Sequence, residues 1–201
     1  CIKLKIGALD FNEEISLLGE IRKYYDENQM TLRVDANGAF SSTEAMIKLE
    51  ALADLGLHSI EQPIAKGQYN AMEDLCSRSP VPIALDEELI GIIKKKNRIE
   101  LLDKIMPQYL ILKPSLLGGF RSCEEWITLA DMRSIGWWVT SALESNIGLN
   151  AIAQWTFSLG LNGHQGLGTG SLFTNNFESP LEVRNGYLTF NFNQNWNFPF
   201  L

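Results

Sequence analysis

The stretch Leu32-Arg33-Val34-Asp35-Ala36-Asn37-Gly38 combines an apolar, β-branched run with an acid and then with turn-forming residues. That order is typical of a short buried strand that ends at Asp35. It recurs three times further along the chain, where an apolar run closes on Glu61, on Asp86 and on Lys113. An acid at such a point is either a helix cap or a ligand, and this stretch alone does not decide between the two.

The spacing of these charged strand ends predicts how the strands are arranged. Lys5, Asp35, Glu61, Asp86 and Lys113 follow one another at intervals of 25 to 30 residues. Such an interval fits one strand, one helix and two turns, which is the repeat of a right-handed parallel βα unit. Because all strands of such an array point the same way, their charged ends gather at one rim, where a closed βα barrel carries its active site. The sequence therefore predicts an α/β fold of the TIM-barrel type.

Three carboxylates, those of Asp35, Glu61 and Asp86, would repel one another at such a rim. A hard cation between them resolves that repulsion. Since these positions include no histidine or cysteine, magnesium is favoured over zinc, with manganese as its alternative. The pair Lys3 and Lys5 shares one face of the first strand, although lysines on an edge strand also serve to discourage aggregation.

The composition limits the classes of partner. The chain has 201 residues, 45% of them hydrophobic, which is enough to bury a core of its own. A net charge of −7 argues against a nucleic-acid or anionic-membrane partner. The sequence has neither a membrane-length apolar run nor a signal-peptide pattern, so it predicts a soluble, cytoplasmic protein. The oligomeric state is not predicted.

The start of the chain favours an interpretation as the later part of a longer protein, because Cys1 already lies inside an expected strand. Seven strand units are expected, whereas a closed barrel has eight. We expect residues 1–174 to form strands 2 to 8 of the barrel with their helices, and residues 175–201 to form a separate C-terminal segment. That segment contains an expected hairpin around Asn185-Gly186.

Several short strings, in their order along the chain, resemble the enolase superfamily in its muconate-lactonizing subgroup, and within it the o-succinylbenzoate synthase family. The strings are Lys3-Leu4-Lys5, Val34-Asp35-Ala36-Asn37, Ile60-Glu61-Gln62-Pro63, Leu85-Asp86-Glu87, Leu112-Lys113-Pro114, Ser141-Ala142-Leu143-Glu144-Ser145 with Gly148, and Gly166-Leu167-Gly168-Thr169. The resemblance implies a TIM-like barrel whose mouth is closed by an N-terminal capping domain. It identifies this chain as a C-terminal fragment without that domain or the first barrel strand, with residues 175–201 returning toward the cap.

The resemblance also implies an enzyme that removes a proton α to the carboxylate of a small-molecule substrate. The residues implied to hold Mg²⁺, or Mn²⁺ in its place, are Asp35, Glu61 and Asp86. Lys5 would be the base, and Lys3 beside it would favour the neutral form of Lys5 by repulsion. Lys113 would stay protonated and stabilise the intermediate by charge and by a cation–π contact.

The reaction implied is the syn-dehydration of 2-succinyl-6-hydroxy-2,4-cyclohexadiene-1-carboxylate to 2-succinylbenzoate, through an enediolate, in menaquinone biosynthesis. Ser141, Gly166 and Gly168 would hold the succinyl end of the substrate. Asn37 and Glu87 would steady the metal ligands and Lys5.

Two other functions remain open at this point. An N-acylamino acid racemase or a dipeptide epimerase would use the same metal site, with Lys5 and Lys113 as bases on opposite faces of one carbon. Dipeptide epimerases of the family carry an acidic pair at the last strand, where this chain has Gly166-Leu167-Gly168-Thr169, which counts against that activity alone. The remaining alternative is a catalytically inactive barrel fragment, in which the carboxylates only cap helices and no capping domain excludes water from the site.

Overall fold

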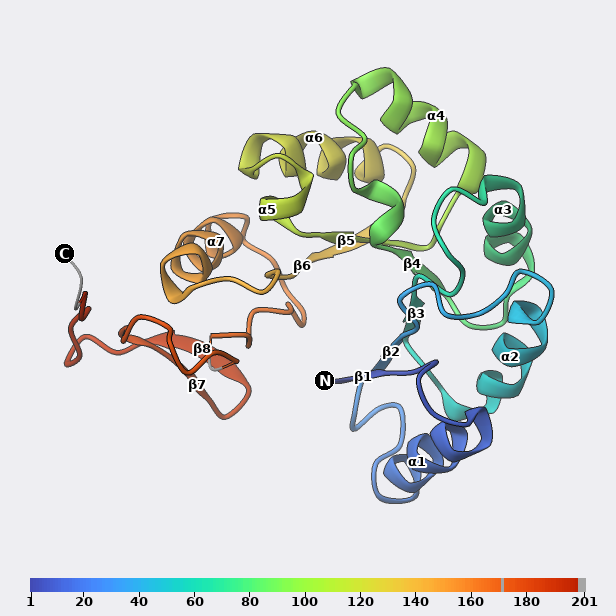
Figure 1. Cartoon of the computed structure of the whole chain (residues 1–201), viewed down its shortest axis with the longest axis horizontal. Helices are drawn as coiled ribbons and strands as arrows, with labels where there is room; N and C mark the ends of the chain where they lie inside the picture. The colour runs from blue at the N-terminus through green and yellow to red at the C-terminus, as the bar shows by residue number, and fades with distance from the viewer. Residues whose placement is uncertain (171, 199–201) are drawn as a thin grey trace. The chain divides into compact units, whose positions relative to one another are not determined.

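The structure is a computed structural model that describes residues 1–170 and 172–198 (Figure 1). The chain divides into two compact units, one formed by Cys1–Ile111 with Glu125–Trp137 and the other by Leu112–Glu124 with Trp138–Leu201. Each unit is described separately below. Among the described residues, none of the helices combines the length and the apolar character of a membrane span.

Strands and helices alternate along most of the chain. The strands are β1 (Ile2–Lys5), β2 (Leu32–Asp35), β3 (Ser59–Glu61), β4 (Ile83–Leu85), β5 (Tyr109–Leu112), β6 (Gly136–Val139), β7 (Leu181–Arg184) and β8 (Tyr187–Phe190). The helices are α1 (Phe11–Tyr24), α2 (Ala45–Leu52), α3 (Tyr69–Arg78), α4 (Lys95–Ile105), α5 (Pro114–Leu117), α6 (Phe120–Asp131) and α7 (Asn146–Ser158), with short 3-10 helices η1 (Ala53–Leu55) and η2 (Glu87–Leu89).

The register of the sheet aligns the charged strand ends. Strands β1 to β6 form one sheet in the order of the sequence, and the pairs from β1 to β5 are parallel, as predicted. Lys5 lies opposite Asp35, and Asp35 lies opposite Glu61. Glu61 pairs with Ala84, so Asp86 follows two residues beyond that partner and belongs to the same face of the sheet.

The apolar core of the first unit lies between its strands and helices α1 to α4, which line one side of β1 to β4 (Figure 1). Buried strand residues in this core alternate with the charged ones, because successive side chains of a strand point to opposite faces. Fully buried members of the core include Leu18, Leu32, Leu49, Ile60, Met72, Ile83 and Leu102. The face of the strands away from the helices is therefore the polar one.

Glu14 fixes the loop that follows Lys5. Its side chain is buried in the first turn of α1. The carboxylate oxygen Oε1 accepts hydrogen bonds from the backbone N–H groups of Gly7 (2.7 Å), Ala8 (3.1 Å) and Leu9 (3.0 Å). The end of β1 is thereby tied to the start of the following helix.

We expect Glu14→Ala to lower the free energy of unfolding by about 2 to 4 kcal/mol, because three backbone donors lose one buried acceptor. Urea denaturation followed by circular dichroism measures this loss. The control is Glu13→Ala, an exposed carboxylate in the same helical turn, for which a change within about 0.5 kcal/mol is expected. Equal losses in the two variants would contradict the anchoring role of Glu14.

The second unit contains the predicted hairpin and a short contact in place of a seventh strand. Strands β7 and β8 pair antiparallel around Asn185 (φ 51°) and Gly186 (φ 80°), which confirms the hairpin and its Asn-Gly turn. After β6, Thr140 pairs with Gly166 in one isolated parallel bridge. In the described part of the chain the seventh expected strand is therefore no longer than this bridge. The boundary after residue 174 stays a prediction.

Candidate active site

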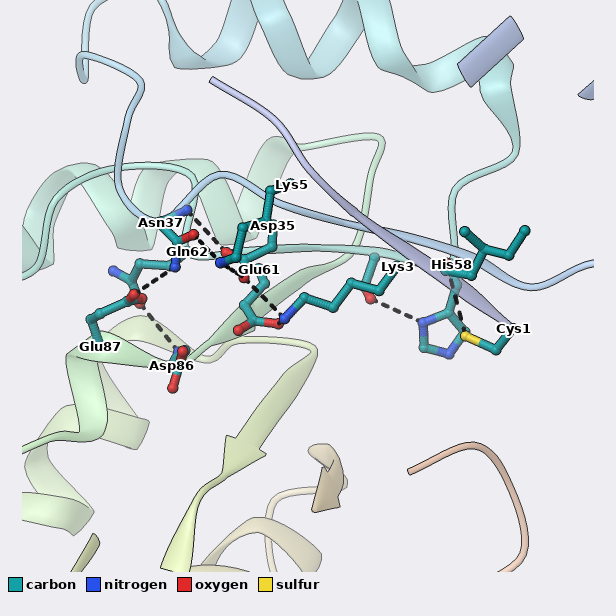
Figure 2. A network of polar contacts seen from close by, with 12 residues as sticks. Cys1, Lys3, Lys5, Asp35, Asn37, His58, Glu61, Gln62, Asp86 and Glu87 are labelled. Carbon is teal, nitrogen blue, oxygen red and sulfur yellow. Dashed lines mark hydrogen bonds and ion pairs between the residues drawn. The ribbon is translucent and has the colours of Figure 1, made fainter. Parts of the chain in front are cut away.

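Acids and lysines meet at the carboxyl ends of β1 to β4 (Figure 2). Lys3 and Lys5 come from β1, Asp35 and Glu61 end β2 and β3, and Asp86 directly follows β4. The three carboxylates are 1%, 2% and 2% exposed. The structure therefore gathers the predicted residues of the first unit at one end of the sheet, through the register described above.

Lys3 bridges two of the predicted metal ligands. Its Nζ lies 2.9 Å from Oδ2 of Asp35 and 2.6 Å from Oε2 of Glu61. Burial alone would lower the pKa of Lys3, but the neighbouring Glu61 and Asp35 carboxylates outweigh burial and raise that pKa above its ordinary value. Lys3 is therefore held as a cation, which suits charge compensation and not proton abstraction.

Lys5 lies at the more accessible side of this cluster. Its Nζ is 3.0 Å from Oδ2 of Asp35 and donates to Oδ1 of Asn37, while its side chain is 69% exposed. Asn37 in turn donates from Nδ2 to Oε1 of Glu87 (2.9 Å) and from its backbone N–H to Oδ1 of Asp35 (3.0 Å). Asn37 and Glu87 are thus placed where they can steady Lys5 and a carboxylate, although that role stays a prediction.

The electrostatics of the acids follow from burial and from one another. Burial raises the pKa of Glu61, and the positive charge of Lys3 lowers it. Repulsion from the Asp35 and Asp86 carboxylates raises it further, so the pKa of Glu61 reaches about 8. Burial would also raise the pKa of Asp35, but Lys3 and Lys5 hold it below its ordinary range. Additional positive charge beside Glu61 would therefore be stabilising.

The donor set suits a divalent cation, but the side chains do not form a closed metal cage. Within residues 1–170 and 172–198, no three or more His, Cys, Asp or Glu side chains stand in a metal-binding arrangement. Oxygens of Asp35 and Glu61 contact Lys3 instead. Three buried carboxylates at adjacent strand ends are nevertheless the oxygen ligands that Mg²⁺ and Mn²⁺ prefer. Binding of Mg²⁺ or Mn²⁺ at this site stays a prediction, which rests on the chemistry of these carboxylate ligands.

Gln62 and Glu88 belong to the surroundings of the site and were not assigned a role from the sequence. Both side chains are buried, and Nε2 of Gln62 donates to Oε2 of Glu88 at 3.1 Å. The available signal was the position of Gln62 directly after Glu61, between Ile60 and Ile64, because an amide that becomes buried there requires hydrogen-bond partners.

The second unit brings together a different group of the predicted residues. The Ser141 backbone N–H donates to the carbonyl oxygen of Gly166 (3.0 Å), and its Oγ lies 2.6 Å from Oγ1 of Thr169. Thr169 was not among the predicted substrate-binding residues. Lys113 immediately precedes helix α5. The roles of Lys113, Ser141, Gly166 and Gly168 stay predictions.

Comparisons with known proteins place this arrangement in a family. The sequence profile described as enolase C-terminal domain-like matches residues 1–192. The chain is similar to the o-succinylbenzoate synthase of Desulfotalea psychrophila, with 56% identity over 188 residues, which cover 94% of this chain and 51% of that protein. It is also similar to the N-succinylamino acid racemase of Thermus thermophilus, with 33% identity, 73% of this chain and 37% of that protein.

The solved structures agree with this assignment. The crystal structure of MenC from Desulfotalea psychrophila LSv54 superimposes with a TM-score of 0.89 at 55% identity, covering 94% of this chain and 52% of that chain. The present chain thus spans about half the length, or less, of these relatives. The chain belongs to the enolase C-terminal domain-like family, as a barrel domain of the enolase superfamily.

Proposed function

We propose that this chain carries active-site residues of an o-succinylbenzoate synthase, a magnesium-dependent lyase of menaquinone biosynthesis. The reaction removes water from 2-succinyl-6-hydroxy-2,4-cyclohexadiene-1-carboxylate to give 2-succinylbenzoate. The observation that carries the proposal is the 56% identity, over 94% of the chain, to a protein of that name. Because the chain spans about half of that relative, the proposal concerns the natural gene product that contains it.

The carboxylates serve charge stabilisation in this reaction. Asp35, Glu61 and Asp86 would hold the divalent ion, which supplies positive charge to the substrate carboxylate while its α proton leaves. Enzymes of the superfamily generally use a divalent metal ion, and magnesium is our proposal within that class, with manganese as its alternative. The burial of all three carboxylates and the raised pKa of Glu61 support a need for such a charge.

Lys5 would move the proton. In its neutral form, Nζ takes the proton from the carbon next to the carboxylate and then returns a proton to the departing hydroxyl group on the same face of the ring. One proton and one hydroxide leave together as water, and the ring becomes aromatic. The exposure of the Lys5 side chain and its contacts with Asp35 and Asn37 support this role.

The remaining residues would bind the intermediate and the substrate. Lys113 would stay protonated and stabilise the anionic ring by charge and by a cation–π contact. Ser141, Gly166 and Gly168 would contact the succinyl end, with Thr169 as a further hydroxyl beside Ser141. These positions belong to the second unit, and the roles proposed for them rest on the family resemblance of the strings that contain them.

A second candidate activity is racemisation of N-succinylamino acids, favoured by the 33% identity to a racemase of that class. The two substrates share a succinyl group and a carboxylate with an adjacent C–H bond. Racemisation requires a proton acceptor on each face of one carbon, so Lys5 and Lys113 would both act as bases. Synthesis of 2-succinylbenzoate requires a base on one face alone.

The test offers the natural gene product the cyclohexadiene acid and, separately, an N-succinylamino acid, in deuterated water with Mg²⁺. We expect loss of the diene absorbance and no α-deuterium in the recovered amino acid. Deuterium exchange in the amino acid without loss of the diene absorbance would favour racemase activity over synthase activity. Turnover of both compounds would assign both activities to the protein. A protein that is folded and metal-loaded but acts on neither compound would refute the proposal.

A further inference from the structure

We propose that Gln62 is a positioning residue that joins the three strand ends carrying the predicted metal ligands, an inference that rests on the proposed metal site. Gln62 directly follows Glu61 and is fully buried. Its φ of 41° lies in the left-handed region, which residues other than glycine seldom adopt. A buried amide on a strained backbone persists when its surroundings determine it strongly.

The side chain of Gln62 is fully used in hydrogen bonds, mainly toward the segment that follows β4. Oε1 accepts from the backbone N–H groups of Asp86 (3.2 Å) and Glu88 (3.3 Å). Nε2 donates to Oε2 of Glu88 (3.1 Å) and to the carbonyl oxygen of Ile64 (3.0 Å). An amide group offers two donors and two acceptor sites, so all four are satisfied and its orientation is fixed.

The backbone of Gln62 extends this connection to the neighbouring strand ends. Its N–H donates to the carbonyl oxygen of Ala84 in β4 (2.9 Å). Its carbonyl oxygen accepts from the backbone N–H of Gly38 (2.7 Å), which belongs to the loop that follows Asp35. Together with the side-chain bond to the N–H of Asp86, these contacts link the ends of β2, β3 and β4 through one residue.

Glu88 explains why an amide is suited to this position. Its carboxylate is buried, and its second oxygen accepts from the backbone N–H of Gly67 at 2.7 Å. A buried carboxylate needs donors, and Gln62 supplies one while its own oxygen still accepts two backbone N–H groups. Loss of the amide would remove one donor to Glu88 and the acceptor of the Asp86 N–H, so the backbone that carries the Asp86 carboxylate would lose an anchor.

The first test is Gln62→Met, which keeps the length of the side chain and removes its hydrogen bonds. We expect the dissociation constant for Mn²⁺, measured by electron paramagnetic resonance on the folded natural gene product, to rise by about 10- to 100-fold, as is typical when contacts behind metal ligands are lost. The matched control is Gln68→Met. In the unchanged protein, Nε2 of Gln68 donates to the carbonyl oxygen of Ala65 at a solvent-accessible site. The Mn²⁺ affinity of this variant is expected to stay within about twofold of the unchanged protein.

A reciprocal exchange tests the hydrogen bonds themselves and covers a Met variant that does not fold. Gln62→Glu keeps the oxygen that accepts from Asp86 and Glu88 but sets two carboxylates against each other. Gln62→Glu also sets a carboxylate oxygen against the carbonyl oxygen of Ile64. Adding Glu88→Gln restores one donor and one acceptor between the pair but not the bond to Ile64, so the double variant is expected to recover about tenfold of the lost Mn²⁺ affinity and not all of it.

The outcomes separate this inference from the proposed function. A folded Gln62→Met or Gln62→Glu variant with unchanged Mn²⁺ affinity would overturn the positioning role. An unchanged protein that binds no Mn²⁺ would overturn the metal site and this inference together. A protein that shows the expected Mn²⁺ losses but dehydrates no cyclohexadiene acid would support the positioning role while refuting the synthase activity.

Discussion

Replacing Lys5 by Arg is expected to lower kcat for the dehydration by about 10²- to 10⁴-fold, the usual contribution of a general base. Arginine keeps the positive charge that contacts Asp35 and Asn37, but its guanidinium stays protonated and accepts no proton. The measurement is the loss of diene absorbance at saturating Mg²⁺. Because the charge is retained, Mn²⁺ affinity and the urea midpoint should change little.

The control for this substitution is Lys23→Arg, an exposed lysine of helix α1 that pairs with Glu20. Its kcat is expected to match that of the unchanged protein. A Lys5→Arg variant that retains a third or more of the original kcat would show that the proton leaves to another group. The result would then remove Lys5 from the mechanism while leaving the carboxylate site intact.

The strand ends could be predicted from the sequence because their physical cause is local. A charged residue after a short apolar run marks the end of a buried strand, and the alternation of side chains fixes the register. A slip of one residue would turn Asp35 toward the helices and Val34 away from them, so the pairing of Asp35 with Glu61 follows from the pattern. The hairpin at Asn185-Gly186 was predictable for a similar reason, since both residues tolerate positive φ.

The contacts around the site could not be predicted in the same way, because they depend on side-chain conformation. The bridge from Lys3 to Asp35 and Glu61 requires a flexible lysine to extend along the strand toward the carboxylates. The pair Ser141 and Thr169 comes from positions 28 residues apart. The four side-chain hydrogen bonds of Gln62 correspond to no periodic pattern in the sequence. Such contacts arise only once the backbone elements are in place.

Substitution of Glu61 by Gln is expected to have opposite effects on stability and on function. The amide imitates the protonated acid, the form that burial and the charges of Asp35 and Asp86 favour, but it gives up the ion pair with Lys3, which favours the carboxylate. Below the unfolded-state pKa of about 4.5, Glu61 is protonated in both states and the substitution gains nothing. As the pH rises toward the folded-state pKa of about 8, the unfolded chain releases a proton that the folded protein retains, so the unchanged protein loses stability that the variant keeps.

The metal-free Glu61→Gln variant should therefore be more stable than the unchanged metal-free protein at pH 8, by an amount on the order of a few kcal/mol, and equally stable near pH 4.5. Urea unfolding at the two pH values measures the difference. The control is Glu50→Gln, an exposed carboxylate of helix α2, for which no pH-dependent difference is expected.

Function should change in the other direction, because an amide oxygen is a poorer ligand for a hard cation than a carboxylate. We expect Mn²⁺ affinity and dehydration to fall by more than the roughly 10- to 100-fold that contacts behind the ligands contribute. A residue that only pairs with Lys3 would instead lose stability at pH 8 when the ion pair is removed. Lower stability together with unchanged Mn²⁺ affinity would thus assign Glu61 to the fold, and higher stability with lost affinity would assign it to the metal.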